Sequence, residues 1–160
     1  MGRKYSITFN GTYTNAGGNT DLLEILPADD KPVKLKGFVL SQTSEVGDAA
    51  EENIRVTVLR LPATVTSGSG GSTPTAPPPD SADSAFGGTP EANNTTVATT
   101  SGTAVTLLDI GWNERNTPFD FWFPEGLEPK AKQGEGLVIR GETTPADDLT
   151  FSITAFVEEE

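Results

Sequence analysis

The chain has 160 residues and a formal net charge of −12 at pH 7, from 11 Lys and Arg against 23 Asp and Glu. This charge argues against nucleic acids and anionic membranes as partners, because both would repel the chain. The absence of Cys and His excludes thiolate chemistry and removes the commonest general base and metal ligand. We therefore expect one domain over residues 1–160 that is not an enzyme, holds no cofactor or metal, and has proteins or sugars as its partners.

Apolar and polar residues alternate in the first part of the chain, which predicts strands. Tyr5, Ile7 and Phe9 alternate with polar residues in the period-two pattern of a half-buried strand. The polar and Gly-rich residues that follow, 11–18, are expected to form a loop. Further strands are predicted at residues 22–26, 33–40 and 53–61.

Residues 62–102 are rich in Gly, Ser, Thr and Pro, and no strand or helix is predicted there. Their composition is typical of linkers or disorder. Long irregular connections inside a domain are uncommon and are usually functional or disordered. We interpret residues 62–102 as an insertion, held in place by its own domain together with neighbouring subunits. Its main apolar residues, Val65, Phe86 and Val97, are predicted interface residues.

The strands resume after this insertion. They are predicted at residues 103–110, within the aromatic stretch 112–123, at 137–139 and, with the clearest alternation, at 149–157. With the strands before the insertion, this gives about eight. The count is typical of an all-β, two-sheet sandwich of the jelly-roll type with a long central insertion. An immunoglobulin-like sandwich and a small barrel are the alternatives.

Five aromatic residues lie between positions 112 and 123. On a strand, Phe119, Phe121 and Phe123 share one face, and we expect this face to lie in the core. Trp122 then points to the other side. Trp112 and Trp122 remain open between a core role and an interface role, because Trp is enriched at buried contacts between proteins.

The tetrapeptide Pro-Ala-Asp-Asp occurs twice, at Pro27–Asp30 and Pro145–Asp148. One hypothesis is that its carboxylates bind calcium, which prefers several oxygen ligands. The preferred hypothesis is that both copies are turns, because Pro and Asp favour turns and no calcium-loop spacing is present. Paired carboxylates for glycoside hydrolysis are a less favoured alternative, since that chemistry needs a definite separation across a cleft.

The sequence resembles a family of small proteins encoded in the structural gene clusters of tailed bacteriophages and prophages. The resemblance rests on Pro27-Ala-Asp-Asp-Lys-Pro-Val-Lys-Leu-Lys-Gly, on Ser41-Gln-Thr-Ser-Glu-Val-Gly-Asp-Ala-Ala-Glu-Glu-Asn-Ile-Arg-Val-Thr-Val-Leu-Arg, and on the short motifs Gly68-Ser-Gly-Gly-Ser and Asn93-Asn-Thr-Thr. It covers most of the chain and is weak after Gly111. The family has no catalytic residues to carry over.

The resemblance implies a virion component, in the first place a capsid decoration (cement) protein that binds the major capsid protein on the outer capsid surface. It would be a homo-oligomer, with a trimer favoured, made in the host bacterial cytoplasm. The N-terminal residues lack a long apolar run and no segment has the length of a membrane span, so we expect a soluble protein. The alternative function is a virion adhesin or a carbohydrate-binding module of a head fibre or tail, with Trp112 and Trp122 as its stacking platform.

Overall fold

The computed structural model describes residues 2–44, 51–116 and 118–160. Residues 45–50, which belong to the stretch that carries the family resemblance, lie outside the described residues, as do Met1 and Thr117. No described segment forms a helix long and apolar enough to cross a bilayer. The described strands are β1 (Arg3–Tyr13), β2 (Thr20–Leu26), β3 (Val33–Gln42), β4 (Asn53–Leu61), β5 (Val65–Thr66), β6 (Thr89–Asn94), β7 (Thr99–Thr100), β8 (Val105–Asn113), β9 (Phe119–Trp122), β10 (Lys130–Ala131), β11 (Gly136–Gly141) and β12 (Leu149–Glu159).

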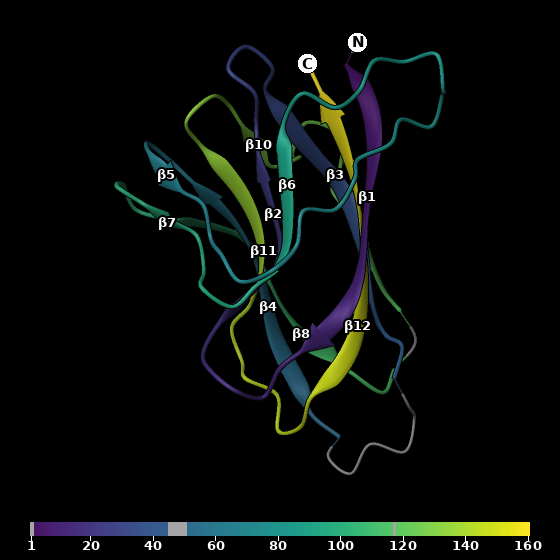
Figure 1. Ribbon diagram of the computed structural model, residues 1–160, viewed down its shortest axis with the longest axis vertical. Helices are drawn as coiled ribbons and strands as arrows, with labels where there is room; N and C mark the ends of the chain where they lie inside the picture. Colours follow the sequence, from purple (N-terminus) through teal and green to yellow (C-terminus); the bar gives the residue numbers. More distant parts are fainter. Residues whose placement is uncertain (1, 45–50, 117) are drawn as a thin grey trace.

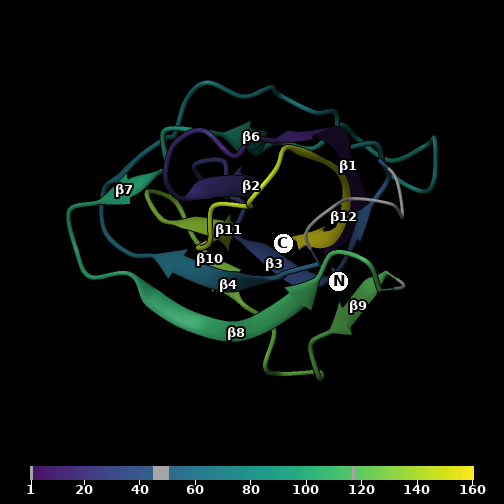
Figure 2. The same cartoon turned by 90° about the horizontal axis from the view of Figure 1, so that it is seen from below.

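The strands form two antiparallel sheets that face each other across the core. Sheet A has the order β1-β12-β3, with β9 and β10 following one another along the outer edge of β3. Sheet B has the order β6-β2-β11-β4-β8. Figure 2 shows the two curved layers end-on, with β8, β4 and β11 in one and β3, β12 and β1 in the other.

The chain connects the two sheets in the order that is typical of a jelly roll. Strands β1 to β4 alternate between sheet A and sheet B, the chain crosses back to sheet A from β8 to β9, and β11 and β12 again lie in different sheets. The central strands are therefore paired with partners far away in the sequence. The predicted all-β sandwich of jelly-roll type is confirmed.

Period-two alternation decides which residues fill the core between the sheets. Along β12, every second side chain from Leu149 to Val157 is buried, and the residues between them are half-buried on the outer side. In β4, Ile54, Val56 and Val58 lie fully buried in the same core. The predicted strand at 53–61 and its inner face are confirmed.

Strands β1 and β8 run well beyond their predicted ends, and strand pairing explains both differences. Strand β1 continues through Gly11 to Tyr13 instead of ending in a loop, because β12 pairs with its whole length, down to Tyr13 opposite Leu149. Strand β8 runs on to Asn113, because β4 pairs with it as far as Asn53. This places Trp112 in β8, opposite Ile54, and not in the aromatic strand that follows.

The insertion connects two neighbouring strands. Strands β4 and β8 are antiparallel, with Arg60 opposite Val105, so residues 62–102 belong to the connection of a single hairpin. The prediction that the insertion holds no strand is wrong, because β5 and β7 pair with each other and β6 joins the edge of β2. Figure 1 shows the β5–β7 ribbon on one side of the sandwich and the rest of the insertion, which includes β6, running past β1.

Candidate functional site

The β5–β7 ribbon and the residues before β7 cover part of the outer face of sheet B. Leu59 and Leu61 of β4 and Val138 of β11 point away from the main core, yet all three are buried. They form a second, smaller cluster with Ala98 of the insertion, against which Val65 of β5 packs. The insertion therefore completes a hydrophobic cluster of its own domain.

A buried ion pair holds this part of the insertion to sheet B. The Asp21 side chain is fully buried and Arg140 is 11% exposed, and Arg140 Nε donates to Asp21 Oδ1 over 2.5 Å. The Ala98 amide donates to Asp21 Oδ2 over 2.6 Å, and Arg140 Nη2 donates to the Ala98 carbonyl over 2.9 Å. Both backbone polar groups of Ala98 are thus satisfied by side chains, much as a neighbouring strand would satisfy them.

A second buried carboxylate, Glu24, holds the insertion three residues further along β2. Glu24 Oε2 accepts hydrogen bonds from the Gly68 amide, over 3.0 Å, and from Asn94 Nδ2, over 3.1 Å. The backbone approaches closely at Gly68, where an added Cβ would lie 2.5 Å from the Thr96 carbonyl oxygen. Only a glycine fits this approach without displacing backbone.

The Glu24→Gln substitution is expected to stabilise the fold at neutral pH. Burial raises the pKa of Glu24 above its usual 4.5, although the hydrogen bond from the Gly68 amide acts against this rise. A raised folded-state pKa means that the folded chain holds its proton more tightly, so ionisation of Glu24 removes stability as the pH rises above 4.5. Gln cannot ionise and keeps the oxygen that accepts from Gly68.

Urea unfolding of both proteins at several pH values tests this expectation. The free energies of unfolding should be similar below pH 4.5, and the variant should become the more stable protein as the pH approaches neutrality. A difference that is the same at every pH would contradict it. The Glu91→Gln substitution is the matched control, because Glu91 lies opposite Glu24 on β6 and is only half-buried.

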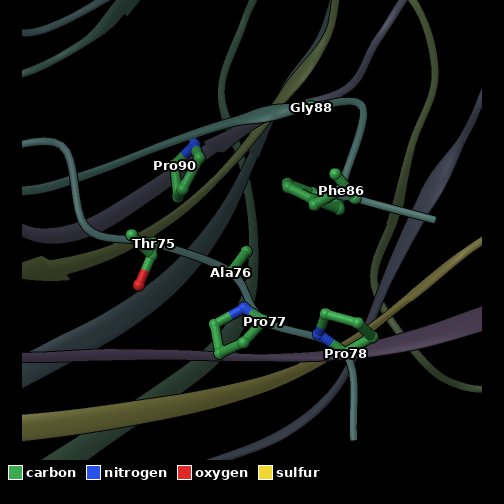
Figure 3. Close-up of a pocket in the computed structure, with 8 residues that line it drawn as sticks. Thr75, Ala76, Pro77, Pro78, Phe86, Gly88 and Pro90 are labelled. Atoms are coloured by element: carbon green, nitrogen blue, oxygen red, sulfur yellow. The ribbon is translucent and has the colours of Figure 1, made fainter. Parts of the chain in front are cut away.

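The remaining part of the insertion lies along the open edge of β1. The Ser6 amide donates to the Pro77 carbonyl over 3.1 Å, and Tyr5 Oη donates to the Ser84 carbonyl over 3.0 Å. The Phe86 ring packs on Tyr5 with ring centroids 5.0 Å apart. An open hollow of about 310 Å³ remains between the limbs of the insertion, and Figure 3 shows Ala76, Pro77, Pro78, Phe86 and Pro90 around it.

These contacts explain how a segment of such composition is ordered. Three groups of its own domain, the Asp21–Arg140 pair, Glu24 and the edge of β1, hold it along its length. The contribution of the domain itself, which we expected from the sequence, is therefore visible. The contribution of neighbouring subunits stays a prediction.

The predicted interface residues do not come together in one place. Phe86 lies at the edge of β1, Val65 lies over the outer face of sheet B, and Val97 is half-buried next to Ala98. Trp122 lies on sheet A and is 54% exposed. The predicted interface set is therefore spread over separate surfaces.

The two tryptophans have different environments. Trp112 is only 2% exposed and belongs to the core, so the predicted interface role of Trp112 is corrected: its side chain is buried within its own domain. The expected core packing of the three phenylalanines is confirmed, because Phe119, Phe121 and Phe123 are half-buried against the core. Only Trp122 presents an indole to the outside.

Both Pro-Ala-Asp-Asp copies form connections at opposite ends of β12. In the first, the Lys31 amide donates to the Ala28 carbonyl, and Lys31 lies 3.8 Å from Glu159 at the end of β12. In the second, Asp148, just before β12, accepts from the Asn15 amide over 2.6 Å. Within residues 2–44, 51–116 and 118–160, no three Asp or Glu side chains converge as metal ligands would. The two copies therefore do not build one site.

Comparisons with protein-family models, with curated proteins and with solved structures return no match to this chain. A jelly-roll sandwich hosts many unrelated functions, so the fold alone does not assign one.

Sequence reasoning missed Asp21, Glu24 and Arg140, which hold the insertion. One signal was present: Asp21 and Glu24 flank and interrupt an otherwise apolar run at residues 22–26. Charged residues on a buried strand are rare unless they are paired, so carboxylates at these positions indicate a partner on the covering segment.

Proposed function

We propose that this chain is a structural protein of a bacteriophage virion, a capsid decoration (cement) protein that binds the major capsid protein on the outer capsid surface. We propose no catalytic role. The family resemblance of the sequence supports this function, as does a jelly-roll fold, which is frequent in viral capsid and lectin domains. The net charge of −12 also suits a partner other than the packaged DNA.

The observation that carries the proposal is the open hollow within the insertion. Its lining is mostly apolar, with Ala76, Pro77, Pro78, Phe86 and Pro90 contributing, and it opens outward at the edge of β1. The surrounding chain is held by hydrogen bonds to Ser6 and Tyr5, so the hollow is formed before a partner arrives. A preformed apolar hollow can accept an apolar side chain of a neighbouring subunit at a low entropic cost.

We further propose that the chain acts as a homo-oligomer, with a trimer favoured. Each copy would offer one hollow, and several copies linked together would bind the capsid lattice through several weak contacts at once. Such linked contacts can exceed the affinity of a single contact by orders of magnitude. Light scattering after size exclusion chromatography measures the oligomeric state directly.

Two measurements test the decoration role. A quantified gel of purified particles should show this chain in near-stoichiometric ratio to the coat protein. In addition, Ala85→Arg places a long charged side chain at the hollow and should weaken capsid binding at least tenfold, about 1.4 kcal/mol. Ala82→Arg is the matched control, because Ala82 is exposed in the same loop and does not line the hollow.

The copy number and the capsid binding of the two variants distinguish the decoration role from its alternatives. A few copies per particle would contradict the decoration role and favour the second candidate, a virion adhesin or carbohydrate-binding module of a head fibre or tail. Equal capsid binding by the Ala85→Arg and Ala82→Arg variants would show that the hollow is not the contact. The second candidate has one observation in its favour, the exposed indole of Trp122.

A further inference from the structure

The outer face of sheet A carries an aromatic pair, an exposed Trp122 and a half-buried Phe156. One row of residues crosses this sheet, with Ser6 opposite Phe156, Phe156 opposite Gly37, and Gly37 opposite Trp122. The rings of Trp122 and Phe156 are stacked, with centroids 4.8 Å apart and an interplanar angle of 22°. We call Trp122 and Phe156 the aromatic platform.

Gly37 makes this arrangement possible. A Cβ at Gly37 would lie 2.8 Å from Cε3 and 2.9 Å from Cδ2 of Trp122, so the indole occupies the space above the glycine. Trp122 can therefore reach across β3 and lie against Phe156 of β12. Even so, 54% of its surface stays exposed, which is unusual for so large an aromatic side chain.

The aromatic platform borders a hollow that is mostly apolar and carries a few polar groups. The hollow has a volume of about 300 Å³, and Tyr5, Pro79, Val157 and the two rings line it together with Lys4, Ser6 and Lys36. The next row across the sheet contains Thr8, Thr154, Val39 and Asp120. The hydroxyl groups of Ser6 and Thr8, the Lys4 amine and the Asp120 carboxylate thus lie on the rings' side of the sheet or at its border.

An aromatic face with a few polar groups beside it is an arrangement that can hold a sugar ring. One face of a pyranose carries C–H groups with partial positive charge, which are attracted to the negative face of an aromatic ring. The hydroxyl groups at its edge need hydrogen-bond partners, which Ser, Thr, Lys and Asp side chains provide. A volume of about 300 Å³ is at the lower end for ligand pockets, so the site suits one or two sugar residues.

We propose that the aromatic platform is the binding site for a neutral pyranose residue of a glycan, which stacks on Trp122 and forms hydrogen bonds with Ser6 and Lys4. A neutral sugar is chosen because the chain carries a net charge of −12, which disfavours anionic glycans. Lys36, the other cation at the hollow, is already paired with Glu128 and lies 3.7 Å from Glu158. This site does not depend on the decoration role, and its failure would leave that role untouched.

Tryptophan fluorescence gives a direct readout, because the chain has two tryptophans and only one of them is exposed. Trp112 is 2% and Trp122 is 54% exposed, so quenching by iodide or acrylamide reports mainly on Trp122. The probes are neutral oligosaccharides of glucose, galactose, mannose and N-acetylglucosamine in both anomeric linkages. At least one should shift the emission saturably and protect Trp122 from the quencher.

Variants followed by calorimetry or ligand-observed NMR then assign the site. Trp122→Ala should weaken sugar binding more than tenfold, and Trp122→Phe should retain part of it, because a smaller ring still stacks. Leu107→Ala is the matched control: it removes an exposed apolar side chain from β8 of sheet B and should leave binding unchanged. Equal thermal unfolding midpoints would show that the three variants remain folded.

Two results would overturn the proposal. One is that no oligosaccharide binds saturably at concentrations up to about 10 mM. A stacked and hydrogen-bonded sugar should bind with a Kd below this concentration. The other is binding that survives the Trp122→Ala change. If no sugar binds and Trp122 becomes protected from the quencher only on capsids, the aromatic platform is a protein contact and the glycan proposal is wrong.

Discussion

Replacing Arg140 by Met is expected to lower the free energy of unfolding by about 3 to 5 kcal/mol, because it leaves a buried charge without its partner. Asp21 is fully buried, and its carboxylate relies on Arg140 and on the Ala98 amide. Met has a similar volume, so the loss measures the missing charge and hydrogen bonds more than a cavity. Urea unfolding of both proteins at neutral pH measures this loss in the free energy of unfolding.

The same substitution at Arg55 is the matched control. Arg55 forms a bidentate pair with Asp109, over 2.9 and 2.7 Å, but the two side chains are 57% and 46% exposed. An exposed pair of this kind is worth up to about 1 kcal/mol. If Arg140→Met costs no more than Arg55→Met, the ion pair under the insertion does not stabilise the fold.

Replacing residues 66–100 by a short Gly/Ser linker is expected to cost more than about 4 kcal/mol. The ends of the excised segment are close, because Val65 pairs with Thr100, so the linker itself introduces little strain. The cost arises because Leu59, Leu61 and Val138 lose their cover, and each buried aliphatic side chain contributes about 1.5 to 3 kcal/mol. Small domains have only about 5 to 15 kcal/mol in total, so a broad or absent unfolding transition is the expected result.

A shorter excision separates the two parts of the insertion. Replacing residues 73–88 alone keeps Gly68, β6 and Ala98. It removes the Phe86–Tyr5 contact, the packing of Ala76 against the core, the hydrogen bonds along β1 and the hydrogen bond from the Gly87 amide to Glu159. This should cost about 1 to 3 kcal/mol, from one aromatic contact and a few hydrogen bonds. Equal losses for both excisions, measured by thermal and urea unfolding, would show that the cover over sheet B contributes little.

The sequence predicts best those strands whose own alternation of apolar and polar residues determines which face is buried. Strand β4 was predicted with its observed bounds, and the alternation of β12 named its buried face, because one side of each strand faces a continuous core. Strand β6 could not be predicted. Its sequence, Thr-Pro-Glu-Ala-Asn-Asn, has little strand propensity, and it is extended because β2 offers an open edge.

The candidate site was harder to predict, because it depends on which strands become neighbours. The sequence places Trp122 on the face opposite the three phenylalanines, but it leaves both tryptophans open between a core role and an interface role. Pairing decides between them: Trp112 lies opposite Ile54 and enters the core, whereas Trp122 lies opposite Gly37 and stays outside. No local pattern reports that a glycine from β3 will lie beneath a tryptophan from β9.

The pairing of β1 with β12 has a consequence for the synthesis of this protein. Every residue of β1, from Arg3 to Tyr13, pairs with a residue between Leu149 and Glu159, and no other described strand is paired with β1. On the ribosome, this strand must therefore wait until residues 149–159 have left the exit tunnel. During that time Tyr5, Ile7 and Tyr13 are exposed to water, and such unpaired apolar strands are prone to aggregate. A chain that ends before β12 would therefore leave β1 without its strand partner and the sandwich incomplete.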